Sequence, residues 1–449
     1  MSVTQRGDWP ENPTIYQIYP RSFQDTTGSG EGDLQGITRR LDHVAALGVD
    51  AIWLSPFYSS PLCDGGYDVA DHCAIDPRFG TLEDFDALLV RAHDLGLKVM
   101  VDQVFNHTSD THPWFCSSRT GDDPDTRDLY VWADGKPDNP PASAKQRKLA
   151  TGDASNPFTW QQHIHDMLPE DCAAFATDLR DWAGDDAYLL GEVNRGNDAV
   201  DLAMRFSEAG RLDAGYVVDL AEYGLTGRNI AAMIDAGADM GRVAWWLNCH
   251  DQPRAVSRNG DGSAHDARML AALLLALPGP IILFQGDELG QVQTDLPFDA
   301  LHDRADKSLW PNHPGRDGAR TPMAWDDGLN CGFTDADVPW LPVTMPPDGG
   351  AAEQAADPAS VLSFHRRALS LRREMGLSAA RIIVAAAEKD WFIARLSPQD
   401  GPEVVLAVNL SDQARALPKA CRDTDAVLIS APVDDAGMIP ARTCGWWRT

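Results

Sequence analysis

Short apolar runs alternate with amphipathic segments along the first two thirds of the chain. The runs are four to six residues long, which is typical of buried strands, and the segments between them repeat their apolar side chains every three to four residues, as surface helices do. The apolar runs lie at 15–19, 51–55, 97–102, 189–192, 215–220, 243–247 and 281–284, and the clearest helical segments at 37–47, 81–95, 169–182 and 264–277. This alternation predicts an α/β fold of repeated strand–helix units around a parallel sheet.

Two other stretches depart from that rhythm. Residues 108–160 are rich in Asp, Pro, Ser and Gly and contain no run of the buried-strand type, so we interpret them as a shortened inserted subdomain. After a helix near residue 362, strand-like runs at 381–384, 391–396 and 404–410 follow each other without helices. The expected domains are therefore a barrel formed by 1–107 and 161–375, the insert 108–160, and a small antiparallel β domain at 376–449.

Composition limits the choice of partners. The chain has 449 residues, 43% of them hydrophobic, and a formal net charge of -29, which argues against nucleic acid or an anionic membrane as partner. Its apolar runs are too short to span a bilayer, and the first residues resemble no secretory signal. Eight cysteines without a C-x-x-C pair fit reduced thiols, so we expect a cytoplasmic protein.

Polar side chains gather where three of the predicted strands end. The segments are Asp102-Gln-Val-Phe-Asn-His107, Glu192 and Asn248-Cys-His-Asp-Gln-Pro-Arg254. In β/α barrels the carboxyl ends of the strands form the active site. Carboxylates, imidazoles and aromatic rings in one pocket suit a sugar, although each of these residues alone could be a structural one.

Eight segments together carry a resemblance to a known family. They are residues 15–23, 48–56, 66–69, 102–107, 191–192, 250–254, 284–290 and 315–323. In these segments the chain resembles the α-amylase superfamily of glycoside hydrolases (glycoside hydrolase family 13), in its α-glucosidase and oligo-1,6-glucosidase branch. The resemblance implies a (β/α)8-type TIM barrel with a C-terminal antiparallel β domain. It also implies retaining hydrolysis of terminal α-linked glucose from oligosaccharides or disaccharides.

The resemblance also assigns residues. Glu192 is the expected general acid/base, and Asp251 is the expected second carboxylate, which stabilises the transition state. Substrate contacts and support of the pocket are expected from Tyr67, Asp68, Asp102, His107, His250 and Arg254, with Tyr67 and Asp68 at the non-reducing end. No cofactor is required. Calcium is possible but not favoured, since only Asp25 and Asp33 remain as strong donors among the ligands expected in the family's first loop.

One departure from the family changes the functional prediction. The motif Gly-Phe-Arg-x-Asp, which supplies the family's nucleophile at the end of the fourth strand, is missing between His107 and Glu192. The similar Gly210-Arg-Leu-Asp213 precedes the strand at 215–220 and would lie at its wrong end. We therefore expect an incomplete barrel that lacks its fourth strand, and impaired activity.

Three alternatives stay open on the sequence. A substitute carboxylate, for example within 153–166, could keep the enzyme active. The chain could instead be a non-catalytic sugar-binding or interaction protein, or a decayed gene product.

Overall fold

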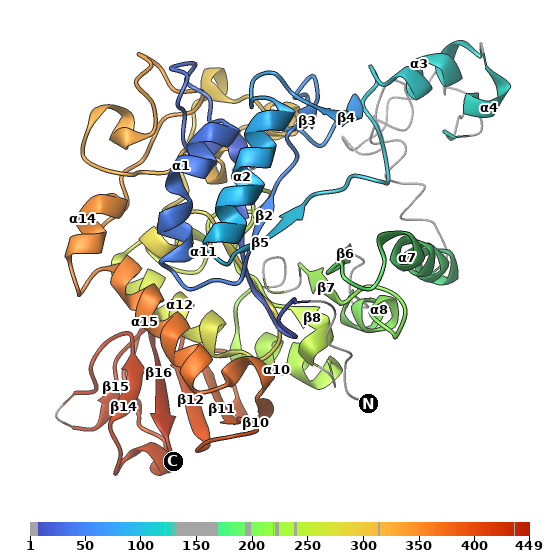
Figure 1. Ribbon diagram of the computed structural model, residues 1–449. Helices are drawn as coiled ribbons and strands as arrows, with labels where there is room; N and C mark the ends of the chain where they lie inside the picture. The colour runs from blue at the N-terminus through green and yellow to red at the C-terminus, as the bar shows by residue number, and fades with distance from the viewer. Residues whose placement is uncertain are drawn as a thin grey trace.

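The computed structural model describes residues 8–121, 123–127, 129–130, 169–193, 199–218, 220, 224–237, 240–312, 315–434 and 436–449 (Figure 1). Most of the predicted insert, including the alternative carboxylates at 153–166, lies outside these residues. No helix in the part of the chain so described is both long and apolar enough to cross a membrane.

Within the described residues, seven parallel strands form the centre of the larger domain, at the seven predicted positions. They are β1 (Thr14–Ile18), β2 (Ala51–Leu54), β5 (Lys98–Val101), β6 (Leu190–Val193), β7 (Ala214–Val217), β8 (Val243–Ala244) and β9 (Ile281–Phe284). Their order is β5-β2-β1-β9 in one sheet and β6-β7-β8 in another, and a parallel bridge between Trp245 and Ile281 joins the two. Among the described residues, β5 and β6 each pair on one side only.

Helices flank these strands, and several begin at the residues that the sequence indicates. Thr81 and Asp84 form a capping box at the start of α2, and Ser263 caps α12. The helices are α1 (Leu34–Ala45), α2 (Leu82–Asp94), α3 (Pro113–Thr120), α4 (Pro124–Arg127), α7 (Pro169–Ala183), α8 (Ala199–Phe206), α10 (Gly227–Ala236), α11 (Ala255–Arg258), α12 (Ala264–Ala276), α13 (Arg304–Leu309), α14 (Ala351–Ala356) and α15 (Val361–Glu374).

Helix α7 does not bury the face that its sequence favours. The apolar pattern predicts one face with Phe175, Leu179 and Trp182, yet Phe175 is 48% and Trp182 79% exposed. The helix instead buries Ala173, Ala176 and Arg180. Phe105, which follows β5, meets the rings of Phe175 and Trp182 edge-on at 6.0 and 6.5 Å between centroids. The larger side chains of α7 therefore lie on the side of the domain where β5 and β6 remain unpaired.

The C-terminal domain is a five-stranded antiparallel sheet in the order β10-β11-β12-β16-β14, as the class of fold predicted. The three predicted runs are β10 (Arg381–Ala387), β11 (Trp391–Ser397) and β12 (Val404–Asn409), whereas β14 (Ala426–Ile429) and β16 (Thr443–Arg448) were not predicted. Two short antiparallel pairs were also missed: β3 (Tyr58–Ser59) with β4 (Asp71–Ile75), and β13 (Arg415–Ala416) with β15 (Met438–Ile439). The buried Trp446 of β16 donates a hydrogen bond from its indole to the carbonyl of Ala272 (2.8 Å), so the sheet packs directly on α12.

Candidate active site

Glu192 lies near the carboxyl end of β6 and stands beside a tyrosine of the next strand. Strands β6 and β7 are parallel, and Glu192 stands opposite Tyr216 in their register. The carboxylate reaches solvent although it lies deep in the fold. Desolvation, together with the negative charge of Asp251, raises the pKa of Glu192 to about 7, and a hydrogen bond with Tyr216 acts against that rise. A carboxyl group with this pKa can hold a proton near neutral pH and donate it.

Asp251 has the opposite electrostatic environment. Arg320 Nη2 donates to its Oδ1 at 2.7 Å, and Arg316 Nη1 donates to the same oxygen at 3.2 Å. Desolvation would raise the pKa of Asp251, but the neighbouring His250, Arg316 and Arg320 outweigh it and hold the pKa well below its usual range. Glu192 and Asp251 are thus two nearby carboxyl groups whose environments separate their pKa values, as an acid and an anion require.

His250 presents one ring nitrogen toward Asp251. Its ring stacks on Tyr67 (centroids 4.9 Å apart, 6° between planes), and Nδ1 lies 3.1 Å from the amide nitrogen of Gln17, which can only donate. Nε2 therefore carries the proton, and it lies 3.4 Å from Asp251 Oδ1. Desolvation lowers the pKa of His250 to about 4, so the ring is a neutral donor at physiological pH.

Asp102, Tyr67 and His107 complete the group at the end of β5. The Tyr67 phenol donates to Asp102 Oδ2 at 2.8 Å. Desolvation raises the pKa of Asp102 to about 6, and Asp251 adds to the effect. His107 is buried, its Nδ1 has no hydrogen-bond partner among the described residues, and burial lowers its pKa. An unpartnered buried nitrogen of this kind is available to a ligand hydroxyl.

Asp68 is part of the loop architecture rather than the surface of the pocket. It is buried and accepts hydrogen bonds from Ser60 Oγ (2.9 Å), Cys63 N (2.8 Å) and Asp64 N (3.1 Å). The carboxylate that meets the arginines of the site is Asp64, which accepts from Arg316 Nη2 at 2.6 Å. A sugar contact by Asp68 stays a prediction.

Four residues of this site were missed from sequence, namely Asp64, Tyr216, Arg316 and Arg320. Both arginines lie in segment 315–323, one of the eight that carry the family resemblance. Their roles were not predicted, because they depend on contacts with residues about 65 or more positions away.

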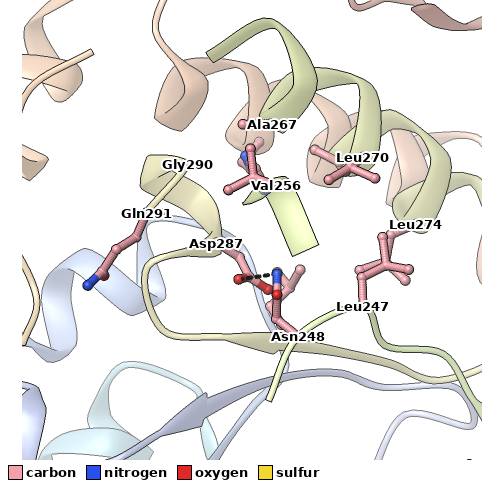
Figure 2. Close-up of a pocket in the computed structure, with 12 residues that line it drawn as sticks. Leu247, Asn248, Val256, Ala267, Leu270, Leu274, Asp287, Gly290 and Gln291 are labelled. Atoms are coloured by element: carbon pink, nitrogen blue, oxygen red, sulfur yellow. Dashed lines mark hydrogen bonds between the residues drawn. The ribbon is translucent and has the colours of Figure 1, made fainter. Parts of the chain in front are cut away.

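Arg254 lies behind the site. It is fully buried, donates from Nη1 to the carbonyl of Gln285 (2.6 Å) and lies 3.5 Å from Asp287 Oδ1. Asp287 also accepts from Asn248 Nδ2 at 2.8 Å, on the wall of a cavity of ≈ 30 Å³ between β9 and α12 (Figure 2). That volume holds about one water molecule and no sugar. Arg254 therefore supports the loop that carries His250 and Asp251.

The two candidate calcium donors accept hydrogen bonds from the protein itself. Asp25 accepts from the backbone N–H groups of Thr27, Gly28 and Gly30, and Asp33 caps α1 by accepting from Gly36 N. Within the described ranges, one carboxylate trio is close enough to share a cation: Asp303, Asp306 and Asp317. These groups already accept hydrogen bonds from backbone N–H groups or from Arg316 and Arg320. Among the described residues, the carboxylates at both places are therefore already engaged by donors of the protein.

Asp213 is a structural residue. Its Oδ2 accepts from Arg180 Nη2 (2.5 Å) and Leu189 N (2.7 Å), ahead of β7 and thus at the opposite end of the strand from Glu192. Its place at the wrong end of the strand is confirmed.

Comparisons of the sequence with a family model and with curated proteins agree on one family. Residues 17–166 and 172–379 match the family described as "Alpha amylase, catalytic domain". A probable α-glucosidase of Rhizobium meliloti (strain 1021) is 35% identical, and the alignment covers 91% of this chain and 90% of the relative. The glucan 1,6-α-glucosidase of Streptococcus dysgalactiae subsp. equisimilis is 30% identical over 95% of this chain and 96% of its own.

Solved structures agree in fold. An α-glucosyl transfer enzyme, XgtA, superimposes with a TM-score of 0.85 at 32% identity, covering 98% of this chain and all of the other. The trehalulose synthase MutB from Pseudomonas mesoacidophila MX-45 gives a TM-score of 0.81 at 27% identity, covering 98% of this chain and 99% of its own.

Proposed function

Because this chain belongs to the α-amylase catalytic-domain family, with its (β/α)8 barrel and C-terminal β domain, we propose that it acts on terminal α-linked glucose in oligosaccharides or disaccharides, at a reduced rate. The observation that carries the proposal is the pairing of Glu192, whose pKa is raised to about 7, with Asp251, which two arginines keep anionic. Names of relatives that hydrolyse α-glucosides support the substrate class.

In the proposed reaction Glu192 protonates the oxygen of the bond that breaks. Asp251 stabilises the positive charge that develops on the sugar ring, and His250 Nε2–H donates to a hydroxyl of the same sugar. Tyr67, stacked on His250, fixes the orientation of the imidazole. Substrate enters at the solvent-exposed carboxylate of Glu192, at the carboxyl ends of the strands.

We propose that the covalent step of the reaction is the one that is slowed. A retaining mechanism needs a nucleophilic carboxylate at roughly 5 Å from the acid. Of the described carboxylates that interact with Glu192, Asp251 is held by two arginines and Asp102 by Tyr67. The alignment with the Rhizobium relative runs over 497 residues, whereas this chain has 449, so the relative contains residues without a counterpart here. Both observations support the loss of the nucleophile segment, and with it the fourth strand.

Glucose release from an aryl α-glucoside and from isomaltose tests the proposal, with Glu192→Gln as the matched variant. We expect slow turnover, roughly 10³-fold or more below that of an intact relative, because the nucleophile is missing. Azide should raise the turnover of the aryl substrate: its nitrogen bonds to the anomeric carbon as the aryloxide leaves, which gives the β-glucosyl azide. A substitute nucleophile would be shown by turnover at the rate of the relative that is lost in Glu192→Gln and does not change with azide. That result would refute the proposal that the activity is impaired.

A non-catalytic sugar-binding role is the second candidate. It is favoured by a site that retains His107, His250 and Asp251 while the nucleophile motif is missing. Calorimetry with glucose separates the two, since glucose binding by a folded protein without any turnover, with or without azide, fits only this second role.

A further inference from the structure

Tyr216 is placed beside Glu192 by the pairing of β6 and β7. In parallel strands, residues that face each other in the register project to the same side of the sheet. Glu192 and Tyr216 are such a pair, so the Tyr216 phenol lies beside the Glu192 carboxyl group, where it lowers the pKa of Glu192. No sequence motif marks this tyrosine.

The backbone next to both residues is tightly fixed. Gly191 and Gly215 also face each other, one position before Glu192 and Tyr216. A Cβ added at Gly191 would lie 2.5 Å from the Leu212 side chain, and one at Gly215 would lie 2.8 Å from Ala203 Cβ. Since atoms cannot approach so closely, both glycines let β6 and β7 pack in full contact with their neighbours. The distance between Glu192 and Tyr216 is thereby fixed by the fold.

The ring of Tyr216 is held from two further strands. Its centroid lies 5.7 Å from that of Trp53 on β2 and 6.3 Å, edge-on, from that of Trp246 after β8. Both tryptophans are buried, so the phenol has little freedom to turn away from Glu192. Burial and the charge of Glu192 raise the pKa of Tyr216 well above its usual value, so the phenol stays protonated and acts as a donor.

We propose that Tyr216 is a positioning residue for Glu192, whose phenol directs the carboxyl group toward the bond to be cleaved and sets how readily it loses its proton. The assignment of Glu192 as the acid rests on the proposed function; the contact between the two residues does not. Tyr216 takes no part in bond making, and its effect passes through Glu192 alone.

The other titratable groups around this pair define the direction of the effect. Asp251 and Asp102 face Glu192 and disfavour its anion, and Cys249 and Asp102 face Tyr216. The Tyr216 phenol is therefore the donor that stabilises the Glu192 anion among its described partners. Removing it should let Glu192 keep its proton to higher pH.

The test is a pH titration of the Glu192 carboxyl carbon by NMR in the isotope-labelled full chain, with the resonance identified by its loss in Glu192→Gln. Tyr216→Phe should raise the titration midpoint of Glu192 by roughly one pH unit. Tyr188→Phe is the matched control. Tyr188 precedes β6, the strand that carries Glu192, and its buried hydroxyl has no hydrogen-bond partner among the described residues. An unchanged midpoint in Tyr216→Phe, or an equal shift in Tyr188→Phe, would overturn the proposal.

Fluorotyrosine placed at position 216 keeps the packing and covers the case in which Tyr216→Phe fails to fold. The more acidic phenol is a stronger donor, so the Glu192 midpoint should fall, and no change would again overturn the proposal. Neither titration requires turnover. A chain that releases no glucose can still show the shift, and an active chain without the shift would refute the role of Tyr216 and leave the hydrolase intact.

Discussion

The two sides of the site differ in how they are held. On the side of β8 and β9, Arg316 and Arg320 connect Asp251 to Asp64 and Asp303 in a network in which Arg320 and Asp303 are buried and the Asp251 side chain is 43% exposed. On the side of β5 and β6, the strands lack a second described partner, and Phe105, Phe175 and Trp182 are exposed. The first side fixes a permanent anion through opposite charges. On the second side, a hydrogen bond from Tyr67 holds Asp102, the Tyr216 phenol lies beside Glu192, and desolvation raises the pKa of both carboxyl groups. A stabilising carboxylate needs the first arrangement, whereas a group that must gain and lose a proton needs the second.

Removing one charge from the network should have the largest effect. Arg320→Met removes one of the two arginines that Asp251 and the buried Asp303 share, the other being Arg316, and we expect the free energy of unfolding to fall by about 3 kcal/mol. Denaturant unfolding measures it. Arg91→Met is the control, because its pair with Asp42 is exposed and should be worth about 1 kcal/mol or less. Equal losses of unfolding free energy in the two variants would show that the arginine network stabilises the protein no more than an exposed ion pair does.

On the side of β5 and β6, the free energy of unfolding should depend on pH through Asp102. Desolvation raises the pKa of Asp102 to about 6, above its value of about 3.9 in an unfolded chain. A carboxyl group with a raised folded pKa binds its proton more tightly in the folded state. Its stabilising contribution is present below the unfolded pKa and is lost as the pH rises through about 4 to 6.

Asp102→Asn should therefore stabilise the protein at pH 8 by about 1–2 kcal/mol, after allowance for solvent screening, and should make little difference near pH 4. Asparagine keeps the acceptor for Tyr67. The measurement is denaturant unfolding of both proteins at the two pH values. A variant less stable than the parent at pH 8 would contradict the raised pKa.

The sequence predicted the strands well and the contacts of the site less well. Each of the seven parallel strands is a local apolar run, and Glu192, Asp251 and the two histidines are local to strand ends, so periodicity and motif spacing were sufficient. Asp64 and Arg316 could not be assigned, since their pairing joins positions 252 residues apart. Tyr216 was missed for a related reason: its role comes from the register of β6 against β7, which an apolar run does not encode.

The face of α7 shows where local pattern and tertiary context separate. The spacing of Phe175, Leu179 and Trp182 places these side chains on one face of a helix, and the structure leaves Phe175 and Trp182 of that face exposed, on the side where β6 has no described neighbour. The spacing of apolar residues along a helix indicates which face the helix can bury. What it does bury depends on the elements that surround it.

The smallest expected effect concerns this exposed face. Trp182→Ser removes a ring that is 79% exposed, so we expect the free energy of unfolding to change by no more than about 0.5 kcal/mol. Val90→Ser on α2, where Val90 is 61% exposed, is the matched control and should behave alike. Denaturant unfolding at several protein concentrations is the measurement. A loss of about 2 kcal/mol or more in Trp182→Ser alone would mean that the ring is covered in solution. If that loss grew with protein concentration, the cover would be a second copy of the chain, and the difference between the two sides of the site would belong to the monomer alone.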